Sequence, residues 1–119
     1  MIKNILVVDD SQVDRSRLER LLSSVGYQVA AADNGQAALD AVKKSKPDLI
    51  LMDVNMPVMD GFAATRALRG DAATKDIPVV MVTAKDQKAD KAWGQMLGAK
   101  GYVTKPFTDE DVLSVVRSL

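Results

Sequence analysis

The sequence predicts an α/β domain in which a parallel sheet carries helices on both faces. Short runs rich in β-branched residues alternate with longer segments of helical periodicity, five of each, and this (βα)5 alternation is typical of a doubly wound parallel sheet. The runs Ile5–Val8 and Leu49–Asp53 are apolar almost throughout, as expected for strands that are buried on both sides. Apolar residues make up 47% of the 119 residues, so we expect residues 1–119 to form one packed domain.

The first predicted helix covers Ser11–Val25 and follows the strand Ile5–Val8. It begins with Ser11-Gln12-Val13-Asp14, a capping-box pattern, and Gly26 supplies a C-terminal stop. Helical spacing predicts four inward-facing residues: Leu18, Leu21, Leu22 and Val25.

The second unit pairs a weaker strand, Gln28–Ala31, with an Ala-rich helix over Asn34–Ser45. Pro47 ends this helix, and the third strand, Leu49–Asp53, follows. The inward residues of the helix are expected to be Ala38, Ala41 and Val42.

A loop over Asn55–Gly61 leads into a short helix that is predicted to end near Leu68. Residues 70–77 form a polar loop, and Pro78–Thr83 is the fourth strand. Asp53 therefore ends the third predicted strand, and Thr83 ends the fourth.

The last two units complete the alternation. A fourth helix is predicted from Ala89 to Leu97 and ended by Gly98, with Trp93 and Met96 in its apolar register and therefore expected in the core. Gly101–Thr104 is the fifth strand. Thr108 caps the last helix, whose inward residues are expected to be Val112, Val115, Val116 and Leu119.

Several of these strands end in residues that carry chemistry. Asp9-Asp10 follows the first strand, Asp53 ends the third, Thr83 ends the fourth and Lys105 follows the fifth. All strands of a parallel sheet point the same way, and ligands bind beyond their carboxyl ends. We therefore expect three carboxylates, a hydroxyl and an ammonium group to meet at one edge of the sheet.

This combination suits a divalent cation and a phosphoryl group. Three neighbouring carboxylates repel one another unless a cation binds or the pKa of one of them rises, and Mg²⁺ prefers oxygen ligands of this kind. Each residue also has an ordinary structural interpretation. Asp9-Asp10 could form a solvated turn or a helix cap, Lys105 could be a surface lysine, and Thr83 could be a strand residue with a local hydrogen bond.

Composition excludes several functional classes. The absence of cysteine and histidine excludes thiolate chemistry, a phosphohistidine carrier and a histidine-ligated zinc site. Sixteen basic and sixteen acidic residues balance, which argues against nucleic acid or an anionic membrane as the main partner. With no signal peptide and no apolar stretch near 18 residues, we expect a soluble cytoplasmic domain.

These residues together carry a resemblance to a known family. The acids Asp9-Asp10, the segment Asp53 to Gly61 that contains Met-Pro-Val-Met-Asp-Gly, Thr83-Ala84 and Lys105-Pro106 resemble the motifs of response-regulator receiver domains, such as the chemotaxis protein CheY. The resemblance covers essentially the whole chain. It implies the flavodoxin-like strand order 2-1-3-4-5, which is known for CheY and is taken from the resemblance alone.

The resemblance also implies a role for each site residue. Asp53 would accept a phosphoryl group from a sensor histidine kinase, and Lys105 would pair with the phosphoryl oxygens. Thr83 would be the switch hydroxyl, and Tyr102 the aromatic residue coupled to it. The ligands of Mg²⁺ would be Asp9, Asp10, Asp53 and the main-chain carbonyl of Asn55.

Further expectations concern output and lifetime. The segment Thr83–Gln87, with Trp93-Gly94 and Gly98-Ala99, most resembles receivers of twitching-motility and related chemosensory systems. A downstream motility or regulatory protein would contact the fourth helix, fifth strand and fifth helix of a monomer or weak dimer. Asn55 and Lys85 are hypothesised to set the lifetime of the acyl phosphate, although both could be solvated loop residues. The domain would catalyse only its own phosphorylation and autodephosphorylation.

Other functions remain to be weighed. A pseudo-receiver that binds partners without phosphorylation would share the fold. A phosphatase of the haloacid-dehalogenase type also uses an aspartate nucleophile, Mg²⁺, a hydroxyl and a lysine, but its nucleophile follows the first strand in an Asp-x-Asp motif, and the chain leaves no room for a substrate-covering cap. A flavodoxin needs a hydroxyl- and glycine-rich phosphate loop after the first strand, where Asp9-Asp10-Ser11 would repel phosphate. A nucleotide switch needs a Gly-x-x-x-x-Gly-Lys-Ser/Thr motif, which is absent.

Overall fold

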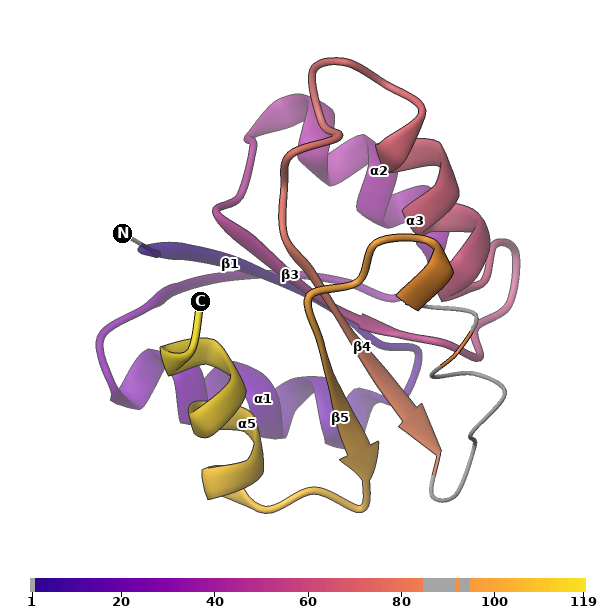
Figure 1. The fold of residues 1–119 in the computed structure, drawn as a ribbon. Coiled ribbons are helices and arrows are strands. Elements are labelled where there is room, and N and C mark those ends of the chain that lie inside the picture. The colour runs from indigo at the N-terminus through magenta and orange to yellow at the C-terminus, as the bar shows by residue number, and fades with distance from the viewer. Residues whose placement is uncertain (1, 85–91, 93–94) are drawn as a thin grey trace.

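Five parallel strands form one sheet in the order β2-β1-β3-β4-β5 (Figure 1). The structure is a computed structural model, and it describes residues 2–84, 92 and 95–119. The predicted fold class and the strand order are both confirmed. The strands are β1 (Asn4–Val8), β2 (Gln28–Ala32), β3 (Leu49–Asp53), β4 (Val79–Ala84) and β5 (Gly101–Lys105).

Four helices in the described part of the chain cover the sheet, two on each face (Figure 1). In each helix, the side chain of the N-cap residue accepts a hydrogen bond from the backbone N–H three residues further on, as expected for Ser, Asn, Asp and Thr caps. The helices are α1 (Gln12–Ser24), α2 (Gly35–Lys44), α3 (Gly61–Arg69) and α5 (Asp109–Arg117).

Alternating side chains divide the core into two layers. On β1, Ile5 and Val7 pack in one layer with α1 and α5, whereas Leu6 and Val8 pack in the other with α2 and α3. The same period of two holds along β3 and β4. Because both faces of the central strands are covered, their apolar runs are continuous, as the sequence indicated.

The glycine at the start of α3 is required by a close approach of two backbone segments. A Cβ atom at Gly61 would lie 2.1 Å from the main-chain oxygen of Asp53, and the Gly61 N–H donates to the Val54 carbonyl at 2.8 Å. The loop between β3 and α3 is therefore folded back onto the end of the strand that carries Asp53.

The predicted elements agree with the structure to within one residue at most ends, but three apolar residues were wrongly assigned to the core. Val25, Met96 and Leu119 are exposed, Met96 to 80%. Val25 and Leu119 lie at helix ends, where the helix no longer faces the sheet. Most of the predicted fourth helix, including Trp93, lies outside the described residues; Ala92, Gln95 and Met96 within it are helical.

The capping box predicted for α1 is only half formed. The hydroxyl of Ser11 accepts the Asp14 N–H at 3.3 Å, but the Ser11 N–H donates to a carboxylate oxygen of Asp9 at 2.9 Å. The cap predicted at Thr108 is confirmed and forms a complete capping box in α5, since Thr108 and Asp111 each accept the backbone N–H of the other. Among the helices whose residues the structure describes, none is long and apolar enough to span a bilayer.

Candidate functional site

Three carboxylates meet at the carboxyl ends of β1 and β3. One oxygen from each of Asp9, Asp10 and Asp53 lies within 4.8 Å of the other two. Val8 and Met52, the residues before Asp9 and Asp53, are paired in the sheet, so the register itself places these acids side by side. Asp9 is 1% exposed and Asp53 6% exposed, whereas Asp10 lies at the surface.

The site opposes the ionisation of Asp53. Burial raises its pKa from the ordinary value of 3.8 to about 7, and the negative charge of Asp9 acts in the same direction. The Lys105 ammonium opposes this rise, as does the hydrogen bond that the Val54 N–H donates to Asp53 Oδ1 at 3.0 Å. Asp53 therefore needs added positive charge to be a fully ionised nucleophile near neutral pH.

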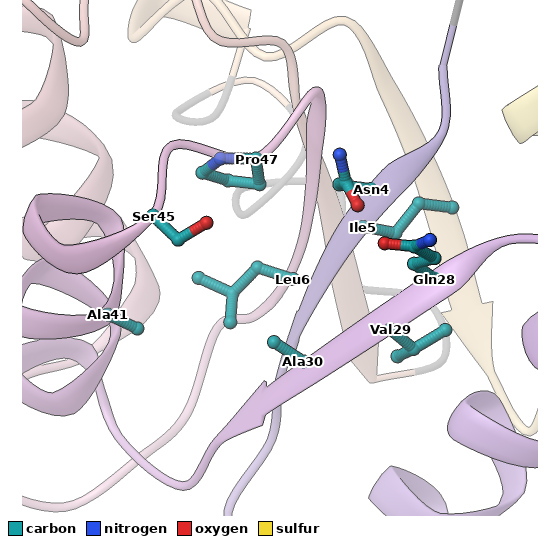
Figure 2. Close-up of a pocket in the computed structure, with 9 residues that line it drawn as sticks. All are labelled: Asn4, Ile5, Leu6, Gln28, Val29, Ala30, Ala41, Ser45 and Pro47. Atoms are coloured by element: carbon teal, nitrogen blue, oxygen red, sulfur yellow. The ribbon is translucent and has the colours of Figure 1, made fainter.

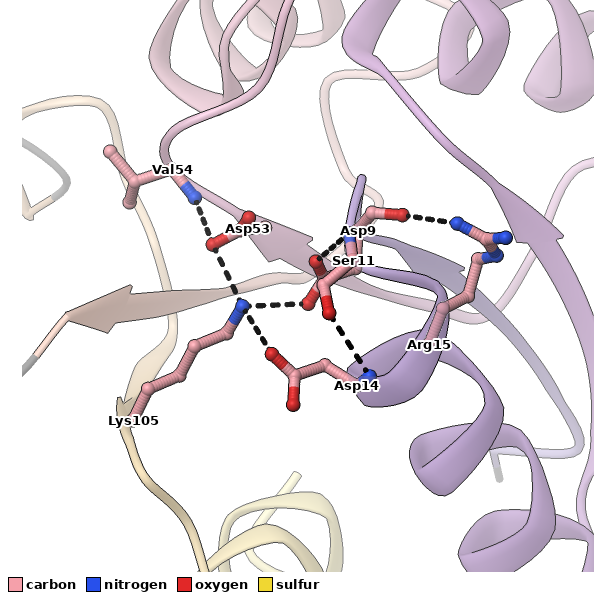
Figure 3. Close-up of polar contacts among 7 residues, drawn as sticks. All are labelled: Asp9, Ser11, Asp14, Arg15, Asp53, Val54 and Lys105. Atoms are coloured by element: carbon pink, nitrogen blue, oxygen red, sulfur yellow. Dashed lines mark hydrogen bonds and ion pairs between the residues drawn. The ribbon is translucent and has the colours of Figure 1, made fainter.

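Lys105 supplies one such charge and lies between three carboxylates (Figure 3). Its Nζ atom is 2.9 Å from Asp9 Oδ2, 3.0 Å from Asp14 Oδ2 and 3.6 Å from Asp53 Oδ1. Burial alone would lower the pKa of Lys105, but contacts with Asp9 and Asp14 outweigh it and raise the pKa above its usual value. The Lys105–Pro106 peptide bond is cis.

Hydrogen bonds to both the side chain and the main chain hold Asp9 in place. Its Oδ1 atom accepts the Ser11 N–H at 2.9 Å, and its main-chain oxygen accepts a hydrogen bond from Arg15 Nη1 at 2.8 Å (Figure 3). Its Oδ2 atom is buried, and its partner in the described part of the chain is the Lys105 ammonium at 2.9 Å. A buried carboxylate oxygen in this position is suited to accept a cation.

The donor set fits magnesium. It consists of carboxylate oxygens only, and Mg²⁺ is usually bound by one or two carboxylates with waters and phosphate oxygens completing its shell. The buried Asp9 Oδ2 and the exposed Asp10 would provide both a fixed and a solvent-facing ligand. Asn55 is exposed and lies two residues beyond Asp53, and its role as a ligand stays a prediction.

Thr83 and Tyr102 lie on the other face of the sheet from Asp53 and Lys105. Val80 and Val82 belong to the layer under α1 and α5, so alternation places Thr83 on the face of α2 and α3. Tyr102 packs against that same layer, and burial raises its pKa. Thr83 is fully buried, and its hydroxyl has no hydrogen-bond partner in the parts of the chain that the structure describes.

The structure thus brings Asp9, Asp10, Asp53 and Lys105 together, whereas the predicted hydroxyl of Thr83 makes no hydrogen bond to them within the described residues. Lys85 lies outside the described residues. Asp14 was missed as a site residue, because its position three residues after Ser11 is that of an ordinary capping-box acid. Its position in the first turn of the helix that follows Asp9-Asp10 was the available signal, since a side chain there lies beside the same strand ends as Asp10.

A separate pocket lies toward the amino ends of β1 and β2, away from the carboxylates (Figure 2). It is bordered by Asn4 and Gln28, at the starts of β1 and β2, and by Ser45 at the end of α2. Figure 2 shows Leu6 and Ala30 on its floor. Its few polar groups do not converge on one point, so the site described above is the better candidate for chemistry.

Comparison with known proteins identifies the family. The model of the response regulator receiver domain matches residues 5–117. The chain belongs to this family. Receiver domains are signalling modules that interact with histidine kinases and downstream effectors and bind Mg²⁺ in an acidic pocket.

The relatives include both single-domain and longer proteins. The chain is 44% identical to protein PilH of Pseudomonas aeruginosa, over 97% of this chain and 95% of PilH. It is 43% identical to the response regulator PleD of Caulobacter vibrioides but spans only 26% of that protein. The predicted resemblance to single-domain receivers of twitching-motility and chemosensory systems is confirmed.

Solved structures give the same result for the fold. The chemotaxis protein CheY4 of Vibrio cholerae superimposes with a TM-score of 0.92 at 36% identity, covering 99% of this chain and 98% of CheY4. A putative response regulator from Chloroflexus aurantiacus superimposes with a TM-score of 0.94 at 32% identity, covering 99% of this chain and 97% of that one.

Proposed function

We propose that residues 1–119 act as a phosphorylated receiver in a two-component system and accept a phosphoryl group on Asp53 from a sensor histidine kinase. The observation that carries this proposal is the position of Asp53. It is nearly buried, lies 3.6 Å from the Lys105 ammonium and shares a cation-sized space with Asp9 and Asp10. An ionised carboxylate in such a place carries a desolvation cost that a bound cation offsets, and carboxylates with a raised pKa cluster at functional sites.

The transfer step follows from this geometry. An oxygen of Asp53 attacks the phosphorus of a phosphohistidine, and the P–N bond breaks as the new O–P bond forms. The imidazole leaves with the electron pair and takes a proton from solvent. Lys105 offsets the charge on the transferring oxygens, so the site works by positioning and electrostatic stabilisation.

The residues that would hold Mg²⁺ are Asp9, Asp10, Asp53 and the main-chain carbonyl of Asn55. The ion, when bound, neutralises charge on the phosphoryl oxygens and on the carboxylate nucleophile. The family binds Mg²⁺ in this pocket, and the convergence of one oxygen from each of Asp9, Asp10 and Asp53 within 4.8 Å supports the same assignment here.

The switch is proposed to need several contacts. Moving a two-state domain from 1:99 to 99:1 requires about 5.5 kcal/mol of differential interaction, whereas one hydrogen bond to a charged group contributes about 1.5–3 kcal/mol. Thr83 alone is therefore insufficient. Thr83 and Lys105 would both contact the phosphoryl group, and the partly buried Tyr102 would move inward as the Thr83 hydroxyl turns away from it.

The output would be a contact with a downstream motility or regulatory protein. The surface proposed for it includes β5 and α5 and the segment before Gly98, and the similarity to PilH and to a chemotaxis protein supports a motility or chemosensory pathway. We propose that the protein works in the cytoplasm as a monomer or weak dimer, without nucleic acid or membrane. Asn55 and Lys85 are proposed to set the lifetime of the acyl phosphate.

Intact-mass analysis with acetyl phosphate and Mg²⁺ tests the proposal. The wild-type protein should gain one phosphoryl group, and chelation of Mg²⁺ should abolish the gain. Asp53→Asn should gain none, while Asp40→Asn, which changes an exposed carboxylate on α2, should behave as the wild type. A wild-type protein that takes up no phosphoryl group would instead support the pseudo-receiver, and turnover of a phosphate ester would support the phosphatase.

A further inference from the structure

Lys105 has one carboxylate partner that the phosphoryl site does not account for. Asp14, in the first turn of α1, places Oδ2 at 3.0 Å from Lys105 Nζ. This contact is 0.1 Å longer than the one with Asp9 and 0.6 Å shorter than the one with Asp53. Figure 3 shows the Asp14 side chain meeting the ammonium from the side of α1, while Asp9 and Asp53 meet it from the sheet.

Asp14 is turned away from the role that its place in the helix would give it. An acid at this position normally closes a capping box by accepting the N–H of the N-cap residue. Asp111 does this in α5, where its Oδ2 atom accepts the Thr108 N–H at 2.9 Å. In α1 the Ser11 N–H donates to Asp9 instead, and the Asp14 carboxylate is left to pair with Lys105.

The same helix also holds the chain beyond Lys105. One turn after Asp14, the guanidinium carbon of Arg17 lies 4.5 Å from the centre of the Phe107 ring. Arg17 Nη2 is 3.3 Å from Asp109 Oδ1. Residues of α1 therefore contact both the Lys105 side chain and the segment that follows it, which fixes the lysine relative to the helix.

We propose that Asp14 is a positioning residue for Lys105, and this inference rests on the proposed phosphorylation of Asp53. An ammonium group has three donors. Asp9 and Asp53 are the two partners whose oxygens turn to a cation and a phosphoryl group when these bind. Asp14 is a ligand of neither the cation nor the phosphoryl group. It therefore keeps one N–H donor of Lys105 occupied, and the other two donors stay directed at Asp53 and the phosphoryl group that it accepts. The lysine is then in place before the phosphoryl group arrives.

Rates of phosphorylation by acetyl phosphate at saturating Mg²⁺ test this role. Asp14→Asn should lower the rate constant about three- to tenfold, the size expected for losing one partly exposed contact between charged groups. Asp14→Glu, which keeps the charge, should recover at least half of the loss. Asp111→Asn is the matched control, because it removes an acid from the same position of another helix, and its rate should remain within twofold of the wild type.

The proposal is overturned if Asp14→Asn reacts at the wild-type rate, or if Asp111→Asn is slowed equally. The second result would mean that a helix N-terminal charge, and not the contact with Lys105, is what matters. Unfolding by urea should show similar stability losses in Asp14→Asn and Asp111→Asn, so stability alone would not explain a difference in rate.

A second readout needs no phosphorylation. The rate of reductive methylation of Lys105, followed by peptide mass spectrometry, should increase several-fold in Asp14→Asn and stay unchanged in Asp111→Asn, with Lys3 as an internal reference. If the wild-type protein takes up no phosphoryl group but Lys105 labelling rises as expected, the proposed function fails while the positioning contact stands. Unchanged labelling would refute the contact itself.

Discussion

The ionisation of Asp53 links the chemistry of the site to the stability of the protein. Its pKa is about 7 in the folded protein and 3.8 ordinarily, so the folded state binds more protons than the unfolded state between these values. The free energy of unfolding therefore falls as pH rises through this window, and the stabilising effect of the protonated form is complete only below about pH 4. The site is thus less stable at neutral pH than its packing alone would make it.

Replacing Asp53 with Asn should reveal this cost. In the presence of a chelator, Asp53→Asn should be more stable than the wild type at pH 8, with little difference at pH 4. The gap between the two pH values should be at most about 4 kcal/mol, because the rise of the Asp53 pKa from 3.8 to about 7 corresponds to about 1.4 kcal/mol for each pH unit and solvent screening reduces it. Urea unfolding of both proteins at both pH values measures it. An equal difference at the two pH values would contradict the raised pKa.

Two buried threonines offer a matched test of the switch hydroxyl. Thr65 and Thr83 are both 0% exposed, but the Thr65 hydroxyl donates to the Gly61 carbonyl at 2.7 Å, whereas the Thr83 hydroxyl has no partner in the described part of the chain. In the unphosphorylated protein, Thr65→Val should lower the free energy of unfolding by about 1 kcal/mol, and Thr83→Val should leave it unchanged or raise it by up to about 1 kcal/mol. A comparable loss in both variants would show that the Thr83 hydroxyl is already satisfied.

The sequence was sufficient to predict the carboxylates but not every partner of the lysine. Asp9, Asp10 and Asp53 follow apolar strands, and strand direction alone brings such residues to one edge. Asp14 lies on a helix, where its pattern equally fits a cap. The structure shows that the Ser11 N–H donates to Asp9 and not to Asp14, which leaves the Asp14 carboxylate available to Lys105.

At the scale of elements, the loop between β3 and α3 packs closely against the end of the strand that carries Asp53. Gly61 approaches the Asp53 carbonyl so closely that no Cβ atom fits, and the fold-back of the loop fixes the backbone of Asp53. Alanine at this position would have to push the end of β3 aside.

Gly61→Ala should therefore destabilise the protein by more than about 2 kcal/mol and slow phosphorylation of Asp53. Gly70→Ala is the control at the other end of α3. A Cβ atom there would meet the carbonyl oxygens of Arg66 and Ala67 at 3.5 and 3.7 Å, which are ordinary contact distances. The φ of Gly70, −80°, is also ordinary, so the change should be neutral or stabilise by up to about 1 kcal/mol. Thermal or urea unfolding of the two variants decides between them, and equal effects would contradict the close approach.

Element types were predictable because period and punctuation agree along this chain. Gly26, with a φ of +100°, ends the first helix as predicted, and caps at Asn34 and Thr108 begin two others. Helical periodicity shows which residues share one face of a helix, but it does not show whether the sheet extends far enough to cover that face. That is why Met96 fits an apolar register and yet is 80% exposed.

In the molecule as a whole, β5 connects the phosphoryl site to the opposite layer. Lys105 lies on the face of Asp53, while Tyr102 and Thr104 lie on the face of α2 and α3, and Thr83 pairs with Thr104 across the sheet. A change in the position of Lys105 or Thr83 therefore acts on the strand that carries Tyr102. This arrangement is compatible with the proposed switch, in which phosphorylation at the carboxyl ends of the strands changes a surface beyond β5.

The site of attachment of the phosphoryl group tests the central claim most directly. After reaction with acetyl phosphate and Mg²⁺, borohydride reduction of the acyl phosphate and tandem mass spectrometry of the peptides should show conversion of Asp53, and of no other aspartate, to homoserine. Omission of Mg²⁺ should prevent the conversion. Conversion at Asp9, Asp10 or Asp14 in place of Asp53, or no conversion at all, would contradict the account.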